Sequence, residues 1–269
     1  PWVSFLPDHQ KTAATSGGLR RALSARLERL CLRHARAVIT NSQHLAGEMR
    51  AAFPNLAVCW IPNGTDPERL PRTKHEPFPG LSLAYVGSLY VGRDLQPVLR
   101  ALQLFLRRNP DAQADGTRLR VAGAMAPEHQ ARFVAQVEEL ALQKHVEFLG
   151  TLPPADALTL LHRSTLAIVL AQQQRMQVPA KIYESVSLHV PTLVVTESDS
   201  ASAKESDRIG AISIEPDNIE AMVTLFEELW SGSRPRRTPP RVPVDYAGLA
   251  EEMARTLNSV IEPAHAHNG

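Results

Sequence analysis

Residues 82–94 read Ser-Leu-Ala-Tyr-Val-Gly-Ser-Leu-Tyr-Val-Gly-Arg-Asp, and apolar residues at helical spacing follow over 95–108. The apolar run 82–86 predicts a buried strand, and the spacing after the glycine turn predicts a helix. A strand that passes through a short turn into a helix is the repeating unit of a parallel α/β sheet. This stretch therefore predicts an α/β fold class.

The same alternation continues toward residue 230. Further strands are predicted over the apolar runs 119–122, 146–149, 166–170, 192–196 and 211–214. Helical spacing lies between them and after the last one, over 128–142, 155–162, 180–188, 201–208 and 219–230. Repeated strands and helices imply a parallel sheet with right-handed crossovers and helices on both faces. Such sheets bind ligands at the carboxyl ends of their strands.

The residues before this sheet predict a second, smaller α/β region. An arginine-rich helix is expected over 19–35, followed by a strand over 37–40, a helix over 42–53 and a strand over 58–61. Four prolines make residues 67–80 an expected linker. A second proline-rich stretch precedes a helix expected over 246–261. The predicted division is therefore 1–66, 67–80, 81–233 and 234–269.

The composition excludes several function classes. The chain has 269 residues, 43% of them hydrophobic, and its 29 Lys and Arg nearly balance 28 Asp and Glu, so no global positive field favours nucleic acid. Its apolar runs are far shorter than the roughly 18 residues of a membrane-spanning helix. Cys31 and Cys59 lack metal-ligand spacing, and we expect them to be buried free thiols in a reducing compartment. These features predict a cytoplasmic protein without a metal site.

The first candidate site is the turn that contains Gly87, Ser88, Gly92, Arg93 and Asp94. A glycine lets backbone N–H groups approach a phosphate, a helix N-terminus favours an anion, and an arginine adds a charged contact. The alternative is a tight turn in which Asp94 caps the helix and Arg93 points to solvent. The turn lacks the Lys-Ser/Thr pair of a P-loop, and no Gly-x-Gly-x-x-Gly fingerprint for NAD or FAD occurs.

The second candidate site is the helix start around Lys181 and Glu184, which are three residues apart and share one helical face. A lysine suits a diphosphate, and a carboxylate can accept two hydrogen bonds from the vicinal hydroxyls of a ribose. The alternative is an ion pair between the two side chains on a solvated face.

Five separated segments, in a fixed order, resemble those of family 4-type glycosyltransferases of the GT-B fold, also called glycosyl transferases group 1. They are Ala-Val-Ile-Thr-Asn-Ser (37–42), Ile-Pro-Asn-Gly-Thr-Asp (61–66), the turn segment from Tyr85 to Asp94, Val-Glu-Phe-Leu-Gly-Thr-Leu (146–152) and Pro-Ala-Lys-Ile-Tyr-Glu (179–184). Together they span most of the chain.

The resemblance implies a two-domain enzyme with a Rossmann-like nucleotide-sugar donor domain at 81–233 and part of an acceptor domain at 1–66. It places Asn63 and Gly64 at the crossover between the domains. By analogy, Arg93 and Lys181 are catalytic cations that neutralise the diphosphate, and five further residues bind the donor: Gly87, Ser88, Gly150, Leu152 and Glu184. Such enzymes typically retain the anomeric configuration and need no metal or other cofactor, because cationic side chains stabilise the departing nucleoside diphosphate.

Two departures from the family pattern bear on function. The family often has another glutamate eight residues before Glu184, near the transferred sugar, whereas this chain has Met176 within a Gln-rich loop, residues 172–177. The sequence also lacks much of the family's N-terminal domain. The alternative to an active transferase is therefore a non-catalytic nucleotide-sugar-binding or interaction module.

The expected partners are a nucleotide-sugar donor and a saccharide, lipid-linked or small-molecule acceptor, as in polysaccharide biosynthesis. The arginines of residues 20–36 suit a peripheral contact with anionic headgroups at the inner membrane face. The alternative is an ordinary basic helix in solvent.

Overall fold

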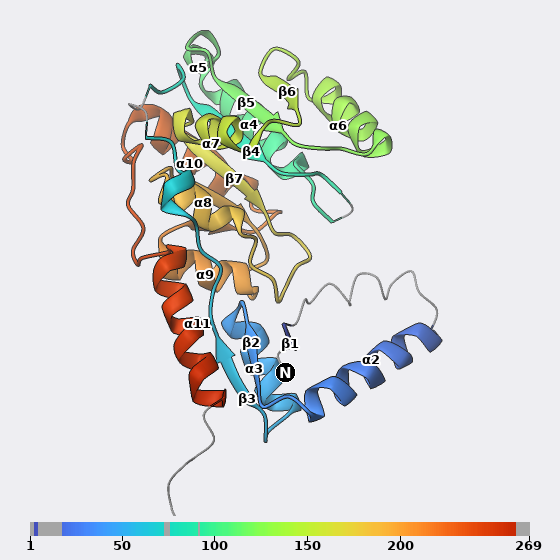
Figure 1. The fold of residues 1–269 in the computed structure, drawn as a ribbon. Coiled ribbons are helices and arrows are strands. Elements are labelled where there is room, and N and C mark those ends of the chain that lie inside the picture. The colour runs from blue at the N-terminus through green and yellow to red at the C-terminus, as the bar shows by residue number, and fades with distance from the viewer. Residues whose placement is uncertain (1–2, 5–17, 73–75, 91, 262–269) are drawn as a thin grey trace, which may run out of the picture. The chain divides into compact units, whose positions relative to one another are not determined.

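The computed structural model describes residues 3–4, 18–72, 76–90 and 92–261, and the chain divides into two compact units (Figure 1). The smaller unit comprises Pro1–Asn63 with Tyr246–Gly269, and the larger unit is Gly64–Asp245. Both proline-rich segments belong to the larger unit. Thr65 N donates to Val244 O at 2.8 Å, and Phe78 N donates to Arg163 O at 3.0 Å.

The larger unit is built on a six-stranded sheet in which every neighbouring pair is parallel, as the sequence predicts. The strand order is β6-β5-β4-β7-β8-β9. The strands are β4 (Ser82–Val86), β5 (Arg118–Ala122), β6 (Val146–Gly150), β7 (Leu166–Leu170), β8 (Thr192–Val195) and β9 (Ile212–Ile214).

Helices cover both faces of this sheet. They are α4 (Gln96–Arg108), α5 (Pro110–Ala114), α6 (Pro127–Glu139), α7 (Pro154–Arg163), α8 (Lys181–Ser187), α9 (Ala201–Ile209) and α10 (Ile219–Ser231). Successive strand residues point to opposite faces. Ile168 packs in the cluster that contains α4, α6 and α10, whereas Ala167 and Val169 pack in clusters with α7, α8 and α9. The short helix α5 was not predicted from the sequence.

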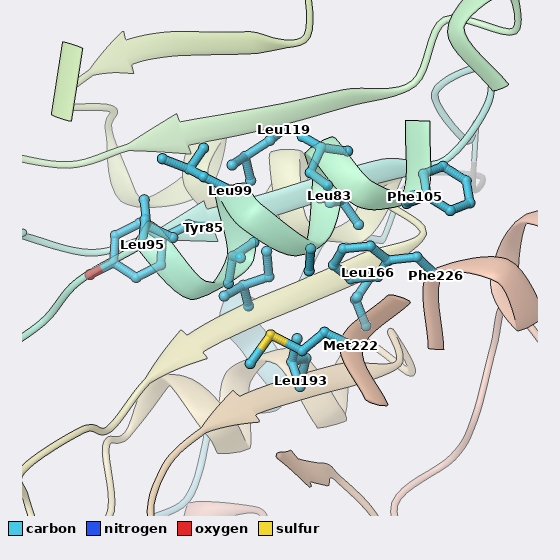
Figure 2. Close-up of a cluster of buried hydrophobic side chains, with 14 of the residues drawn as sticks. Leu83, Tyr85, Leu95, Leu99, Phe105, Leu119, Leu166, Leu193, Met222 and Phe226 are labelled. Atoms are coloured by element: carbon cyan, nitrogen blue, oxygen red, sulfur yellow. The ribbon is translucent and has the colours of Figure 1, made fainter. Parts of the chain in front are cut away.

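The main core lies under α4 and α10 (Figure 2). Leu83, Leu119 and Leu166 from three adjacent strands are fully buried there. Phe105 of α4 meets Phe226 of α10 edge to face, with ring centroids 6.1 Å apart. Burying one such side chain contributes about 1.5–3 kcal/mol, so this cluster holds the sheet in its order.

On the opposite face, α8 is tied to α9 through a buried polar contact. Tyr183 is fully buried, and its hydroxyl donates to Glu205 Oε1 at 2.7 Å. Arg208 donates to both oxygens of Glu205. Burial, followed by the charge of Glu205, raises the pKa of Tyr183, so the phenol stays a donor to the carboxylate. This contact fixes the helix that carries Lys181 and Glu184.

The smaller unit contains a three-stranded parallel sheet, order β1-β2-β3, with β1 (Val3–Ser4), β2 (Ala37–Thr40) and β3 (Ala57–Trp60). Its helices are α2 (Gly18–Arg33), α3 (Gln43–Ala52) and α11 (Tyr246–Ile261). Ser42 caps α3, because its Oγ accepts from Leu45 N at 3.1 Å. The predicted elements of this region are therefore confirmed.

Two further features are the exposure of the cysteines and the apolar character of the helices. Cys31 and Cys59 are free, but Cys31 is exposed on α2 and Cys59 is partly exposed, so the expectation that both are buried was wrong. The apolar neighbours of Cys31 in the sequence lie along a helix that is itself largely exposed. Among the helices of the described residues, none combines the length and apolar character that crossing a bilayer requires.

Three glycines bring the carboxyl ends of β4, β5 and β6 close together. Gly87 N donates to Ala122 O, and Gly123 N donates to Gly150 O, both at 2.8 Å. Gly123 has φ +150°, and a Cβ added to it would lie 1.9 Å from the carbonyl oxygen of Gly87. Glycine is therefore required at position 123.

We expect Gly123→Ala to lower the free energy of unfolding by about 2–4 kcal/mol, because the added carbon forces the backbone of the β4 turn to move. Gly232→Ala is the matched control. Gly232 has φ +79° but no atom within 4 Å of the added carbon, so that variant carries backbone strain without a clash. Urea denaturation measures both, and equal losses in the two variants would contradict the close approach.

Candidate functional site

The strand order reverses between β4 and β7. From β4 the chain moves through β5 to β6 on one side, and from β7 it moves through β8 to β9 on the other. The turn after β4 and the loop after β7 therefore leave neighbouring strands in opposite directions, which opens a crevice above the sheet. Both motifs singled out from the sequence lie on these two segments, at 87–94 and 171–184.

Asp94 and Gln172 join the two segments. The side-chain amide of Gln172 donates to Asp94 O at 2.7 Å, and Asp94 N donates to Gln172 Oε1 at 3.4 Å. Gln172 is 6% exposed. A buried amide that both donates to and accepts from one residue fixes the turn after β4 relative to the loop after β7.

The carboxylate of Asp94 has three further donors. Oδ1 accepts from Gln96 N at 2.8 Å and from Gln136 Nε2 at 3.4 Å, and Oδ2 accepts from Arg132 Nη2 at 2.7 Å. The N-cap of α4 is Leu95, so Asp94 lies one residue before the position that the capping alternative gives it, although it accepts from the first N–H of the helix. The N-terminus of α4 already faces a negative charge, so it is not the place where a phosphate is favoured.

Arg93 is not in solvent, in contrast to the other half of that alternative. Its side chain is half-buried, and its guanidinium carbon lies 4.5 Å from the ring centroid of Tyr90. Arg93 Nε is buried and has no hydrogen-bond partner among the described residues. Burial raises the pKa of the neighbouring Tyr85 to about 12, and the positive charge of Arg93 partly offsets that rise. Arg93 is therefore a cation held at the crevice.

Arg93 lines a cavity of about 450 Å³ between the turn after β4, helix α6 and the ends of β7 and β8. Asp94, Gln172 and Gln173 line it as well. Of the residues proposed from the sequence for catalysis or donor binding, Arg93 is the member that this cavity contains. Lys181 lies on α8, whose core contacts are on the opposite face of the sheet.

Lys181 and Glu184 form the ion pair that the second interpretation of their spacing predicts. Lys181 Nζ lies 2.7 Å from Glu184 Oε2, and the two side chains are 43% and 27% exposed. A pair this accessible contributes about 0–1 kcal/mol, so a ligand can replace it at small cost. Both side chains also keep free hydrogen-bonding capacity, because an ammonium has three donors and a carboxylate has two oxygens.

The remaining predicted donor-binding residues lie at the carboxyl ends of β4 and β6. Ser88 is exposed, and its carbonyl accepts from the Tyr85 hydroxyl at 3.0 Å. Gly87 precedes it, and the N–H of Gly87 donates to Ala122 O. Gly150 ends β6 with φ +67° and open space where a Cβ would lie. Leu152 packs against the apolar cluster under α7. Their backbones therefore border the same edge of the sheet.

The structure adds cavity residues that the sequence analysis did not single out. Those from α6 and from the end of β8 are His129, Arg132, Phe133, Gln136 and Glu197. The strand-end rule could have found Glu197, which lies two residues beyond β8. No spacing in the sequence shows that α6 turns toward the turn after β4.

An acidic residue near this edge pairs with an arginine. Asp199, two residues after Glu197, has its Oδ2 3.1 Å from Arg175 Nη2. Within residues 3–4, 18–72, 76–90 and 92–261, no three His, Cys, Asp or Glu side chains gather as metal ligands do.

Several solved structures have a similar fold. HepE from Anabaena, solved with UDP and glucose, is 16% identical and has a TM-score of 0.66, with 86% of this chain and 65% of that chain covered. A glycosyltransferase from Rickettsia africae is 12% identical, TM-score 0.69, with 85% and 64% covered. The pneumococcal O-GlcNAc transferase GtfA, solved with UDP and GlcNAc, is 11% identical, TM-score 0.62, with 85% and 46% covered.

This chain therefore spans about two thirds or less of the length of the structures it resembles. No curated protein matches it by sequence. The family model described as glycosyl transferases group 1 matches residues 75–239, which is more than half of the 269 residues. The α/β fold class predicted from the sequence is confirmed, and the protein belongs to the glycosyl transferases group 1 family.

Proposed function

We propose that the protein transfers a sugar from a nucleoside-diphosphate sugar to a saccharide, lipid-linked or small-molecule acceptor. The observation that carries this proposal is the half-buried Arg93 at the strand-order reversal between β4 and β7, in a chain of the group 1 family. Two structures of similar fold were solved with UDP together with glucose or GlcNAc, which makes UDP-sugars the first donors to test.

Glycosyl transfer requires the protein to stabilise the leaving nucleoside diphosphate. The bond between the anomeric carbon and the β-phosphate oxygen breaks, a bond to an acceptor oxygen forms, and the acceptor hydroxyl loses its proton. Negative charge grows on the departing diphosphate, and cations fixed in advance lower the barrier to that step. We assign this role to Arg93 and Lys181, with Glu184 holding the ribose hydroxyls.

Arg93 lies in the turn before α4 and Lys181 is the first residue of α8, and these two helices cover opposite faces of the sheet. One diphosphate can therefore meet both cations only above the carboxyl edge of the sheet. The exposed ion pair of Lys181 with Glu184 supports this arrangement, because replacing it costs little. Because two cations can neutralise the diphosphate without a metal ion, we also propose metal-independent transfer. From the family resemblance alone, we propose retention of the anomeric configuration.

The first prediction concerns these cations. Arg93→Ala and Lys181→Ala should each weaken UDP binding by about 1.5–3 kcal/mol, the range for hydrogen bonds to charged groups. Isothermal titration calorimetry measures the change. The matched controls are Arg100→Ala and Lys144→Ala, which remove exposed cations elsewhere in the larger unit and should leave binding unchanged.

The double variant tests whether the two cations act on one ligand. Residues that contact the same group show a coupling energy above about 0.5 kcal/mol. Unchanged UDP affinity in both single variants would show that Arg93 and Lys181 do not bind the diphosphate. Additive losses would place them on separate ligands.

The second prediction concerns turnover. The protein should release UDP from UDP-glucose or UDP-GlcNAc in the presence of a saccharide acceptor, at a rate unchanged by EDTA. A coupled assay for UDP measures this rate. A tenfold or larger loss in EDTA would contradict metal independence, and UDP binding without any release would favour the non-catalytic binding module.

We also propose that α2 provides the membrane contact expected from the sequence, which would place the protein at the inner membrane face. Leu23, Leu27 and Leu30 recur at helical spacing, and each is more than half exposed. Arg26 and Arg29 are exposed on the flank of that stripe. An apolar stripe bordered by arginines is the arrangement that lies flat on an anionic membrane surface.

The third prediction tests this contact by co-sedimentation with vesicles. The protein should bind vesicles containing phosphatidylglycerol and dissociate in high salt, because screening weakens the arginine contacts. Replacing Leu23, Leu27 and Leu30 by serine should abolish most binding, whereas the control Arg255→Ser on α11 should not. Equal binding to neutral and anionic vesicles, or no binding to either, would overturn the proposal.

A further inference from the structure

The first turn of α8 carries Lys181 and Glu184, but the helix itself does little to fix where that turn lies. α8 has seven residues, and its N-cap, Ala180, makes no side-chain hydrogen bond. Alanine has no side-chain oxygen that could accept from the first N–H groups of a helix. The position of the first turn therefore depends on contacts with neighbouring elements.

The last turn of α8 is held by the second proline-rich stretch. Arg237 Nη1 donates to Leu188 O at 2.8 Å, and Thr238 N donates to His189 O at 2.9 Å. A guanidinium at the C-terminus of a helix satisfies a carbonyl that has no partner within the helix. These contacts fix the end of α8, but they lie about two turns away from Lys181.

Helix α9 holds the loop that leads into α8. Ala201 N donates to Arg175 O at 2.7 Å. Ser202 Oγ donates to Gln177 O at 2.8 Å. Within α8, Ile182 adds apolar burial against the cluster that includes α9. Apolar burial is non-directional, so by itself it leaves the rotation of a short helix poorly defined.

A buried polar contact between α8 and α9 defines that rotation. The Tyr183 hydroxyl donates to Glu205 Oε1 at 2.7 Å, and Arg208 Nη2 donates to the same oxygen at 2.6 Å. Arg208 Nε donates to Glu205 Oε2 at 2.8 Å, and the Glu205 side chain is 8% exposed. Both carboxylate oxygens thus have donors, and Arg208 holds the acceptor toward which the Tyr183 hydroxyl must point.

The direction of Tyr183 also sets the directions of Lys181 and Glu184. Successive residues of an α-helix are turned by about 100° from one another. With Tyr183 directed at α9, Lys181 and Glu184 share a face that is turned away from it, where their side chains are 43% and 27% exposed. A displacement of about 1 Å in a positioning group can lower a reaction rate about 100-fold. Rotation of α8 would therefore affect ligand binding at this face.

Stability alone does not account for a carboxylate at this buried position. Removing a carboxylate from water opposes folding, and replacing a buried ion pair by apolar side chains of similar size often leaves stability unchanged or higher. Phenylalanine at 183 and leucine at 205 would supply similar burial. They would not supply a fixed direction between the two helices, because only the hydrogen bond is directional.

We propose that Tyr183 and Glu205 are positioning residues, whose hydrogen bond sets the orientation of α8 and so places the Lys181 ammonium for the diphosphate. The proposal rests on the proposed function in naming that ligand. It assigns a role in donor binding to two residues that are buried away from the ligand, at 0% and 6% exposure.

The fourth prediction compares two replacements of this contact. Tyr183→Phe keeps the ring and removes the hydroxyl, so it should weaken UDP binding about fivefold in calorimetry. The apolar pair, Tyr183→Phe with Glu205→Leu, should regain melting temperature, since Arg208 is 30% exposed and can turn to solvent. Its UDP binding should stay about fivefold weaker. Residues needed only for stability would regain both properties together.

Two controls separate positioning from stability. Phe226→Leu lies in the core under α10, on the other face of the sheet, and it should lower the melting temperature without changing UDP affinity. The second control is Tyr183→Phe made in the Lys181→Ala variant. There the loss of UDP affinity should be smaller by at least about twofold, because the cation that Tyr183 positions is already absent.

Hydrogen exchange in the ligand-free protein tests the orientation of α8 without UDP. Mass spectrometry of the peptide that spans 181–188 should show faster exchange in Tyr183→Phe and in the apolar pair, and no change in Phe226→Leu. If the unaltered protein binds no UDP, the proposed function is contradicted, and the exchange measurement still decides whether this contact holds α8.

The inference is overturned if Tyr183→Phe leaves UDP affinity unchanged, or if the apolar pair regains UDP affinity together with melting temperature. It is also overturned if Phe226→Leu weakens UDP binding by the same factor, or if Tyr183→Phe has an equal effect with and without Lys181. Unchanged exchange over α8 in Tyr183→Phe overturns it whether or not UDP binds.

Discussion

The strand order of the six-stranded sheet constrains this molecule more than any single contact does. With β4 at the centre of the sheet, β5 and β6 are added on one side, and the chain must return to place β7, β8 and β9 on the other. The turn after β4 and the loop after β7 are therefore neighbours in space although they are far apart in sequence. Arg93, Asp94 and Gln172 meet there, and the cavity and the proposed donor site both adjoin that point.

Asp94 determines the local charge at the turn after β4. By taking donors from the start of α4 and from Gln136 and Arg132 of α6, it places a negative charge where a glycine turn and a helix N-terminus would otherwise attract a phosphate. Cationic character is left to Arg93 and to Lys181 on α8. On the side of α4 and α6, the carboxyl edge of the sheet is thus balanced in charge. On the α8 side it presents the ammonium of Lys181, whose ion pair with Glu184 a ligand can replace.

The candidate site could be predicted in part. The glycine turn and the Lys181–Glu184 spacing were visible because turn chemistry and helical periodicity are local properties. The spacing was equally compatible with an ion pair, which the structure contains. The α6 side of the cavity was invisible, because Arg132 and Gln136 have no spacing that distinguishes them from other polar residues of an amphipathic helix. Their importance comes from facing Asp94, 38 and 42 residues away in the chain.

By itself, the sequence determined the alternation of strands and helices, the parallel sheet and the segments that identify the group 1 family, because hydrophobic periodicity and glycine turns act over a few residues. Tertiary structure decided which of those segments meet. It set the strand-order reversal at β4 and β7, assigned the proline-rich stretches to the larger unit, and exposed Cys31 on α2. It also placed the half-buried Arg93 beside Tyr90 and turned Asp94 toward α6. These outcomes depend on contacts between residues far apart in the chain, and no local pattern encodes them.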